Sequence, residues 1–305
     1  MYDMIIIGSG PAGLAAAIYG MRARLSTVII EKQPMSGGQI INTYDVDNYP
    51  GLPGIGGFDL AMKFREHADA LGAQIVTENV QSVELSGDSK KVVTDRGIYE
   101  GRAVVIATGA AHRKLNIPGE EKLTGMGVSY CATCDGAFFR GREVAVIGGG
   151  DVALEDALFL ARGCSKVYLI HRRDAFRGAK VLQEKVFATE NIEVVWDTIP
   201  EEIKGEQQVE AITLLNKKTN EKTELSVQGV FVAVGIEPKT ELFSEIMDID
   251  ENGYIKAGED GVTNIPGVFV AGDVRTKQLR QIITAAADGA NAVTSVEQYL
   301  ISIGK

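Results

Sequence analysis

The chain has 305 residues, of which 45% are hydrophobic and 24% are charged, and it carries a formal net charge of −10. A single hydrophobic core rarely serves a chain of this length, so two domains are expected. The acidic balance argues against a nucleic-acid partner, because such proteins usually present a basic face to phosphates. No apolar stretch approaches the roughly 20 residues that span a bilayer, so no membrane association is expected.

The start of the chain and its few cysteines indicate a cytoplasmic protein. Tyr2 and Asp3 lead directly into the apolar residues 4–7, so a secretory signal peptide is not expected. Three cysteines fit a reducing cytosol better than a secreted scaffold that is held together by disulfides.

A glycine-rich motif opens the chain. Residues 2–7 are expected to form a buried strand, residues 8–13 read Gly-Ser-Gly-Pro-Ala-Gly, and an alanine-rich helix is predicted to run to about residue 23. Such glycines permit a tight turn, a close approach of backbone to a pyrophosphate, and close packing of the helix on the strand. The next predicted strand ends at Glu31, whose carboxylate can accept hydrogen bonds from a ribose. This context predicts a dinucleotide site, with a plain turn between strand and helix as the alternative.

Cys131 and Cys134 form a C-x-x-C pair, which can exchange two electrons by closing and opening a disulfide. Structural zinc is one alternative, but it needs a second C-x-x-C or a histidine pair at short spacing. Cys164 and the three histidines do not provide one. An inert buried pair is the other alternative, and redox use is the interpretation that we favour.

The first pattern returns 140 residues later along the chain. Residues 143–147 are a predicted strand, residues 148–153 form a second glycine-rich turn, a helix is expected to about residue 162, and residues 166–170 are the next strand. The residues after that strand are basic: His171, Arg172, Arg173 and Arg177. Arginines match the 2′-phosphate of NADPH in charge and geometry, whereas a solvated basic loop is the alternative.

The last part of the chain is expected to complete the first unit, which makes the second domain an insertion. Residues 104–109 and 230–235 are predicted strands that end in glycine and close the two units. Residues 267–273 are predicted to be a further strand that ends at Asp273. This residue is a candidate to bond a ribityl chain if the last segment folds back on the first unit, and an ordinary Gly-Asp turn is the alternative. A helix is expected to start near Ile282, followed by a separate helix that ends near Ile301. Hinges are expected at residues 112–118 and 238–242.

With these elements assembled, the chain resembles the low-molecular-weight thioredoxin reductases over essentially its whole length. The most specific matching runs are CATCDG at residues 131–136 and HRRDAFR at residues 171–177, and the others include GSGPAGLAAAIY, IPGE, VAVIGGGDVALEDAL and RQIITAAADGA. The resemblance implies an α/β fold with two Rossmann-like domains of the three-layer ββα type, in which an NADPH domain is inserted into an FAD domain. The implied segments are residues 1–113 and 242–305 for FAD and residues 114–241 for NADPH and the cysteine pair.

The resemblance also implies roles for individual residues. Those implied to contact FAD are Gly8, Ser9, Gly10, Pro11, Ala12, Gly13, Glu31, Lys32, Gly38, Gln39, Asn48, Val80, Thr108, Gly109, Gly272, Asp273, Arg280, Gln281 and Ile282. Those implied to contact NADPH are Gly149, Gly150, Asp151, Val152, Glu155, His171, Arg172, Arg173 and Arg177. Phe138 and Phe139 are candidates for a docking surface, with core packing as the alternative.

The implied activity is thioredoxin-disulfide reduction, in which electrons pass from NADPH through FAD to the cysteine pair and then to thioredoxin. Cys134 would face the flavin, Cys131 would attack the thioredoxin disulfide, and Asp135 would act as acid and base. The inserted domain is expected to rotate, and a homodimer is implied. The alternatives are a reductase with ferredoxin as donor or another protein carrier, a flavin-linked reductase of ferredoxin or quinones, and a nucleotide sensor without activity.

Overall fold

The structure is a computed structural model that describes residues 1–43, 46 and 48–304. The chain divides into two compact units. The first contains residues 1–43, 49–111 and 237 onward, and the second is built on residues 112–236. The second unit is therefore inserted into the first, as the sequence predicts. Within the described residues, no helix is long and apolar enough to cross a membrane.

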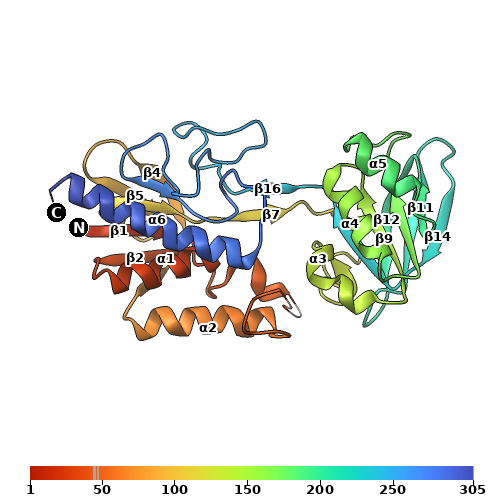
Figure 1. The fold of residues 1–305 in the computed structure, drawn as a ribbon, viewed down its shortest axis with the longest axis horizontal. Helices are drawn as coiled ribbons and strands as arrows, with labels where there is room; N and C mark the ends of the chain where they lie inside the picture. Colours follow the sequence, from red (N-terminus) through yellow and green to blue (C-terminus); the bar gives the residue numbers. More distant parts are fainter. Residues whose placement is uncertain (44–45, 47, 305) are drawn as a thin grey trace. The chain divides into compact units, whose positions relative to one another are not determined.

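The first unit is a seven-stranded sheet with helices packed on one face, and both ends of the chain belong to it (Figure 1). Its strand order is β3-β2-β1-β6-β5-β4, and β17 also pairs with β6. The strands are β1 (Tyr2–Ile7), β2 (Thr27–Glu31), β3 (Gln74–Thr77), β4 (Val80–Glu84), β5 (Lys90–Thr94), β6 (Ile98–Ile106) and β17 (Val268–Val270). The helices are α1 (Pro11–Arg22), α2 (Gly57–Ala70) and α6 (Ile282–Ser302), with a 3-10 turn, η1 (Gly38–Asn42).

Strand β1 lies at the centre of this unit, and its side chains serve both faces of the sheet. Met4 and Ile6 pack with α1 and α6, whereas Ile5 and Ile7 pack against the opposite layer, which includes β5. Alternation of side chains along a strand produces this division. Each of these side chains is fully or almost fully buried, and burial of one such side chain contributes about 1.5–3 kcal/mol.

The end of the chain forms one helix, α6, and the prediction of two helices near residues 282 and 301 is wrong. Asp288 and Gly289 are residue types that disfavour the interior of a helix. Tertiary contacts stabilise both of them within α6. Asp288 is buried in ion pairs. Gly289 packs so closely on α1 that a Cβ atom there would collide with the carbonyl oxygen of Ala12.

Two short strands join the units as a ribbon: β7 (Ala110–His112) pairs with β16 (Ile236–Pro238) (Figure 1). The pairing extends beyond the strands, because Lys239 N donates to Gly109 O at 3.0 Å. The sequence suggests hinges at residues 112–118 and 238–242. Each of these segments begins with backbone that is paired between β7 and β16 or just beyond them.

The second unit contains a parallel five-stranded sheet in the order β11-β10-β9-β15-β8 and an antiparallel sheet in the order β12-β13-β14. The strands are β8 (Val128–Ser129), β9 (Glu143–Gly148), β10 (Lys166–Ile170), β11 (Ile192–Val195), β12 (Thr198–Lys204), β13 (Ala211–Asn216), β14 (Lys222–Ser226) and β15 (Gly229–Ala233). The helices are α3 (Ala132–Asp135), η2 (Gly136–Phe139), α4 (Asp151–Ala161) and α5 (Lys180–Phe187). The second unit thus repeats the layered plan of the first.

Candidate functional site

The first glycine-rich turn lies where the carboxyl ends of four parallel strands meet. Ile7 at the end of β1 is paired in register with Ile30 of β2 and Ile106 of β6, and Ile106 is paired with Val270 of β17. The loops that follow these strands therefore emerge from one edge of the sheet. In open parallel sheets this edge is where ligands bind.

Each glycine of this turn meets a different structural requirement. Gly8 has a φ of 104°, and a Cβ atom there would lie 2.5 Å from Ala107 O. A Cβ atom on Gly13 would collide with the carbonyl oxygen of Gly8, so α1 can approach β1 only through this glycine. Gly10 is the N-cap of α1, has no side-chain cap, and faces open space. The uncapped first turn of α1 suits a phosphate, because its backbone N–H groups need acceptors.

Glu31 is tied to the same turn. Its Oε2 accepts hydrogen bonds from Ser9 N at 2.8 Å and Ser9 Oγ at 2.7 Å, and its Oε1 accepts one from Gln33 N at 2.8 Å. Gly37 N also donates to Ser9 O at 2.8 Å. The end of β2 and the segment before η1 are thereby both attached to the glycine-rich turn.

Asp273, which follows β17, contributes an unsatisfied carboxylate to this edge. Its Oδ1 is buried and has no hydrogen-bond partner among the described residues. Burial raises the pKa of this carboxyl group, against the effect of the nearby Lys277 and Arg280 cations. A buried acceptor without a partner is costly, so a ligand with hydroxyl groups fits here. Together with the uncapped end of α1, this residue makes the site suitable for a dinucleotide.

A buried charge cluster, not identified from the sequence, supports the turn that carries Asp273. Asp288 of α6 accepts from Arg275 Nη2 at 2.6 Å and from Lys277 Nζ at 2.8 Å, and all three side chains are 6–7% exposed. The same carboxylate accepts from Gly272 N at 2.9 Å. Burial alone would raise the pKa of Asp288, but the bonds from Arg275 and Lys277 hold it below the usual value. Only the spacing of Arg275 and Lys277 before an acid inside an apolar helix could have suggested this cluster.

The other residues predicted for the first site occupy several places in this unit. Pro11 and Ala12 form the first turn of α1, and Gln281 caps α6 at its start before Ile282. The guanidinium group of Arg280 stacks over the ring of Tyr254 at 3.9 Å. Thr108 and Gly109 follow β6, Val80 begins β4, and the exposed members of the set are Lys32, Gly38, Gln39 and Asn48.

The second glycine-rich turn repeats the geometry of the first. A Cβ atom on Gly148 would lie 2.5 Å from Ala233 O, and Gly150 is the N-cap of α4, has no side-chain cap and faces open space. Gly149 packs against the His171 ring. Asp151 Oδ1 accepts from Ala179 N at 2.6 Å. This turn also presents uncapped backbone N–H groups to an anion.

The basic loop after β10 divides into exposed and buried members. Arg172, Arg173 and Arg177 are exposed, whereas His171 is 4% exposed. The His171 Nε2 atom lies 3.1 Å from Ala175 O, and Arg177 N donates to Gly149 O at 2.8 Å. The loop is therefore attached to the glycine-rich turn, and the guanidinium groups are available to a negatively charged ligand. Val152 and Glu155 lie exposed on the first turns of α4.

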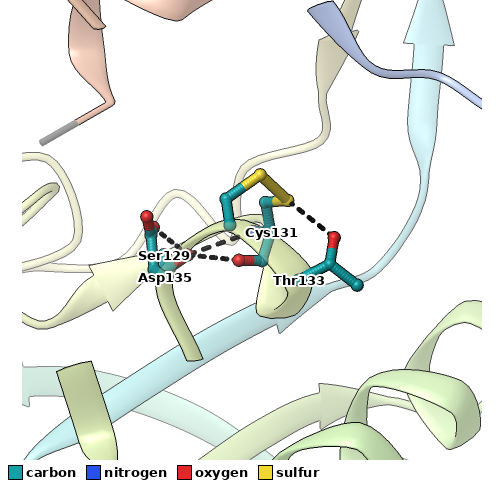
Figure 2. The surroundings of a disulfide bond; sticks show 5 residues. Ser129, Cys131, Thr133 and Asp135 are labelled. Carbon is teal, nitrogen blue, oxygen red and sulfur yellow. Dashed lines mark hydrogen bonds between the residues drawn. A yellow bond between two sulfur atoms is a disulfide. The ribbon is translucent and has the colours of Figure 1, made fainter. Parts of the chain in front are cut away.

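Cys131 and Cys134 form a disulfide directly after β8, at the same edge of the sheet as the second glycine-rich turn. This position follows from the register, in which Val128 of β8 is paired with Val230 of β15, and β15 is paired with β9. Thr133 Oγ1 lies 3.4 Å from Cys131 Sγ (Figure 2). A disulfide sulfur carries no hydrogen, so the Thr133 hydroxyl is the donor.

Asp135 ends the short helix α3 and is bonded to Ser129, the last residue of β8. Ser129 Oγ donates to Asp135 Oδ2 at 2.6 Å, and Cys131 N donates to Ser129 Oγ at 3.1 Å (Figure 2). Burial raises the pKa of Asp135, and the bond from Ser129 opposes that rise. The sequence suggested Asp135 as an acid and base but assigned no role to Ser129 or Thr133.

The segment before the disulfide is held by Glu120, which belongs to the IPGE run. This buried carboxylate accepts from Leu115 N at 2.8 Å, from Asn116 N at 2.7 Å and from the Tyr130 hydroxyl at 2.9 Å. Tyr130 directly precedes Cys131, so Glu120 positions the start of the disulfide loop.

The two phenylalanines that the sequence suggests for docking differ in burial. Phe139 is 7% exposed and packs edge-on against Phe231 in the core, whereas Phe138 is 38% exposed. Core packing therefore accounts for Phe139, and only Phe138 is available on the surface.

Comparisons with known proteins agree with this geometry. Residues 2–289 match the pyridine nucleotide-disulphide oxidoreductase family. The chain is 45% identical to a thioredoxin reductase of Peptoclostridium litorale, over 98% of this chain and 97% of that protein, and 44% identical to one of Bacillus subtilis (strain 168), over 98% and 95%. The crystal structure of a thioredoxin reductase from Streptococcus pyogenes MGAS5005 is similar, with a TM-score of 0.94 and 46% identity over 99% of both chains. The chain therefore belongs to the pyridine nucleotide-disulphide oxidoreductase family, in its low-molecular-weight thioredoxin reductase branch.

Proposed function

We propose that the chain is an NADPH-dependent thioredoxin-disulfide reductase that binds FAD in its first unit. One observation carries the proposal: the Cys131–Cys134 disulfide and the exposed arginine loop both follow strands of one parallel sheet, at its carboxyl edge. A disulfide that can be reduced and a site for a phosphorylated nucleotide then belong to the same unit. The names of the relatives support thioredoxin as the oxidised substrate.

The first unit supports FAD as its ligand. The uncapped first turn of α1 would hold the pyrophosphate, Glu31 would bond the adenosine ribose, and Asp273 would accept from a hydroxyl of the ribityl chain. FAD, when bound, supplies the acceptor for hydride from NADPH and the donor of electrons to the disulfide. The chain's own residues bind and orient this group.

The second unit supports NADPH over NADH. Arg172, Arg173 and Arg177 are exposed on the loop where the first unit has Glu31. Guanidinium groups bond a 2′-phosphate in bidentate geometry, whereas a carboxylate at this position suits a free 2′-hydroxyl. The same residues argue against ferredoxin as the donor, because ferredoxin supplies no 2′-phosphate.

The cysteine pair performs the exchange with thioredoxin after it has been reduced to two thiols. The Cys131 thiolate attacks one sulfur of the thioredoxin disulfide, which breaks that disulfide and forms a mixed disulfide. The Cys134 thiolate then attacks Cys131 Sγ, which restores the Cys131–Cys134 bond and releases reduced thioredoxin. Two electrons leave the enzyme, and the two thiol protons end on thioredoxin. Asp135 takes up and returns a proton during this sequence.

The disulfide and the nucleotide site belong to one unit, and if both serve the same face of FAD, they cannot occupy it together. We propose that the second unit rotates about the β7–β16 ribbon, and that the two sites alternate. A covalent crosslink between the units should stop turnover while it leaves the binding of each cofactor intact. Full turnover in the crosslinked protein would contradict the rotation.

The proposal extends to assembly and location. We propose a homodimer in the cytoplasm, on the basis of the family and of the low cysteine content. Light scattering of the purified holoenzyme measures the mass, and a mass of one chain would contradict the dimer.

The function is tested by the spectrum and by the thiol chemistry of the purified protein. The protein should be yellow, bleach with NADPH rather than NADH, and reduce a disulfide reagent only when thioredoxin is added. The Cys131→Ser variant should lose thioredoxin reduction and keep the bleaching by NADPH. Cys164→Ala is the matched control, because Cys164 is a free, buried cysteine, and it should keep both activities. Thioredoxin reduction by Cys131→Ser would contradict the assignment of the attacking thiol.

A further inference from the structure

We propose that Ser129 is a positioning residue of the disulfide site, which holds the Asp135 carboxyl group through one oxygen and leaves the other oxygen to exchange a proton with the cysteine pair. This inference deepens the proposed function and rests on the assignment of Asp135 as acid and base. It follows from the contacts around one buried hydroxyl group.

The position of the Ser129 hydroxyl is determined by the sheet. Ser129 is the last residue of β8, is 5% exposed, and is paired in register with Phe231 of β15. Strand pairing fixes its backbone, and its burial restricts its side chain. The hydroxyl is therefore a fixed point beside the loop that carries the two cysteines.

The direction of each hydrogen bond follows from the number of protons. Ser129 Oγ accepts from Cys131 N at 3.1 Å, so its single proton is free for one acceptor. Asp135 Oδ2 lies 2.6 Å from Ser129 Oγ and Cys131 O lies 3.3 Å from it, so the Ser129 hydroxyl donates its main hydrogen bond to the carboxylate. The bonds form a chain from Cys131 N through Ser129 Oγ to Asp135 Oδ2 (Figure 2).

This chain makes the two oxygens of Asp135 unequal. Oδ2 serves as an acceptor for Ser129, so a proton that arrives at the carboxyl group is directed to Oδ1. Oδ1 is buried and has no hydrogen-bond partner among the described residues. Loss of the Ser129 hydroxyl would remove a bond that stabilises the charged form, and burial would then raise the pKa of Asp135 further.

Other acids on the elements packed against α3 must be separated from Asp135 in any titration. Helix α4 packs against α3 and carries Asp151, Glu155 and Asp156, and η2 carries no charged residue. Burial, with a smaller effect of Glu155, raises the pKa of Asp156 to about 7. A titration assigned to Asp135 therefore needs the Asp135→Asn variant as its reference.

The test uses the holoenzyme as wild type, as Ser129→Ala, as Asp135→Asn and as the double variant. Carbon-13 NMR of labelled aspartate follows the Asp135 carboxyl group, with Asp135→Asn identifying its signal, and the pH dependence of thioredoxin reduction is measured in parallel. Ser226→Ala is the matched control, since Ser226 belongs to the same unit and, within the described part of the chain, its hydroxyl bonds a backbone oxygen, Glu210 O.

We expect Ser129→Ala to move the titration midpoint of Asp135 upward by about one pH unit and to slow thioredoxin reduction at neutral pH by about tenfold. In the Asp135→Asn background, the same substitution should change neither the rate nor its pH dependence. An unchanged midpoint, or an equal loss of rate in both backgrounds, would overturn the inference. The NMR titration does not require thioredoxin, so failure of the wild type to reduce thioredoxin would count against the proposed function alone.

Discussion

The two glycine-rich turns use one backbone geometry for two different sites. Gly8 directly follows β1 and Gly148 is the last residue of β9, and a Cβ atom on either would lie 2.5 Å from a carbonyl oxygen, that of Ala107 in the first unit and of Ala233 in the second. In both, an uncapped helix begins at a glycine that faces open space. The shared geometry suits a pyrophosphate in each unit but does not distinguish one dinucleotide from another.

The turns differ in the residues that follow the second strand of each unit. Glu31 is bonded to Ser9 of its own turn, whereas Arg172, Arg173 and Arg177 extend into solvent above a buried His171. Under the proposed function, the backbone would supply the affinity for phosphate in both units, and a few side chains at one sheet edge would supply the specificity. The turn that carries Asp273 is held further by the charge cluster of α6, for which the second unit has no counterpart among the described residues.

The largest test of this comparison is Asp288→Asn, which removes the carboxylate between Arg275 and Lys277. Both cations are buried, and an uncompensated buried charge costs about 3–5 kcal/mol. We expect the free energy of unfolding to fall by that amount in urea denaturation, with loss of FAD from the first unit. Asp69→Asn breaks an exposed helix pair with Arg65 and should cost less than about 0.5 kcal/mol. Equal losses in the two variants would contradict the role of the buried cluster.

The second test weakens the preference of the second unit for NADPH over NADH. Arg173→Gln should raise the KM for NADPH about 10- to 100-fold, because a hydrogen bond to a charged group contributes about 1.5–3 kcal/mol. The KM for NADH should stay nearly unchanged, since NADH has no 2′-phosphate. Steady-state kinetics with both nucleotides measures the effect, and Arg142→Gln, an exposed arginine of the same unit, is the control. A parallel rise in both KM values would argue that the loop is only structural.

The third test addresses the acid of the first turn. Glu31→Gln should weaken FAD binding about tenfold, because the amide loses the charge that strengthens a bond to a ribose hydroxyl. Fluorescence during reconstitution of the apoprotein measures the affinity. Glu84→Gln on the exposed end of β4 should bind FAD as the wild type does. Unchanged affinity in Glu31→Gln would remove this residue from the ribose site.

The smallest expected effect is a difference between the two units in how their stability depends on pH. Burial lowers the pKa of His171, so the unfolded chain takes up a proton near pH 6.5 and the folded chain only at lower pH. The contribution of neutral His171 to stability is thus lost as the pH falls below about 6.5. The lowered pKa of Asp288 acts in a separate range, since its contribution is present above about pH 3.9 and is lost as the pH falls through its folded value.

His171→Phe isolates this effect, because the variant keeps an aromatic ring at this position but has no group that titrates. Its stability should decline less than that of the wild type between pH 7.5 and pH 5.5, as measured by urea denaturation. The comparison with wild type is necessary because the raised pKa of Asp156, about 7, acts in the opposite direction. An equal decline in both proteins would contradict the titration of His171.

Much of the fold follows from local patterns in the sequence. The apolar runs of β1, β9 and β10 and the glycines after them predict strand, turn and helix, because burial and steric limits act over a few residues. The basic residues from His171 to Arg177 were likewise recognisable as a group. The cysteine spacing was sufficient to suggest a redox pair, and the structure joins these cysteines in a disulfide.

Local patterns account for these elements and for the residue types available for chemistry, whereas contacts between distant segments bring particular residues together. Asp288 and Gly289 suggest a helix break, yet α6 continues, because packing on α1 and ion pairs with Arg275 and Lys277 satisfy them. His171 belongs to the basic run but is buried beneath it. Ser129 became part of the site because β8 is held beside β15, which places its hydroxyl 2.6 Å from Asp135. Such contacts depend on strand register and helix packing, which no short segment of sequence contains.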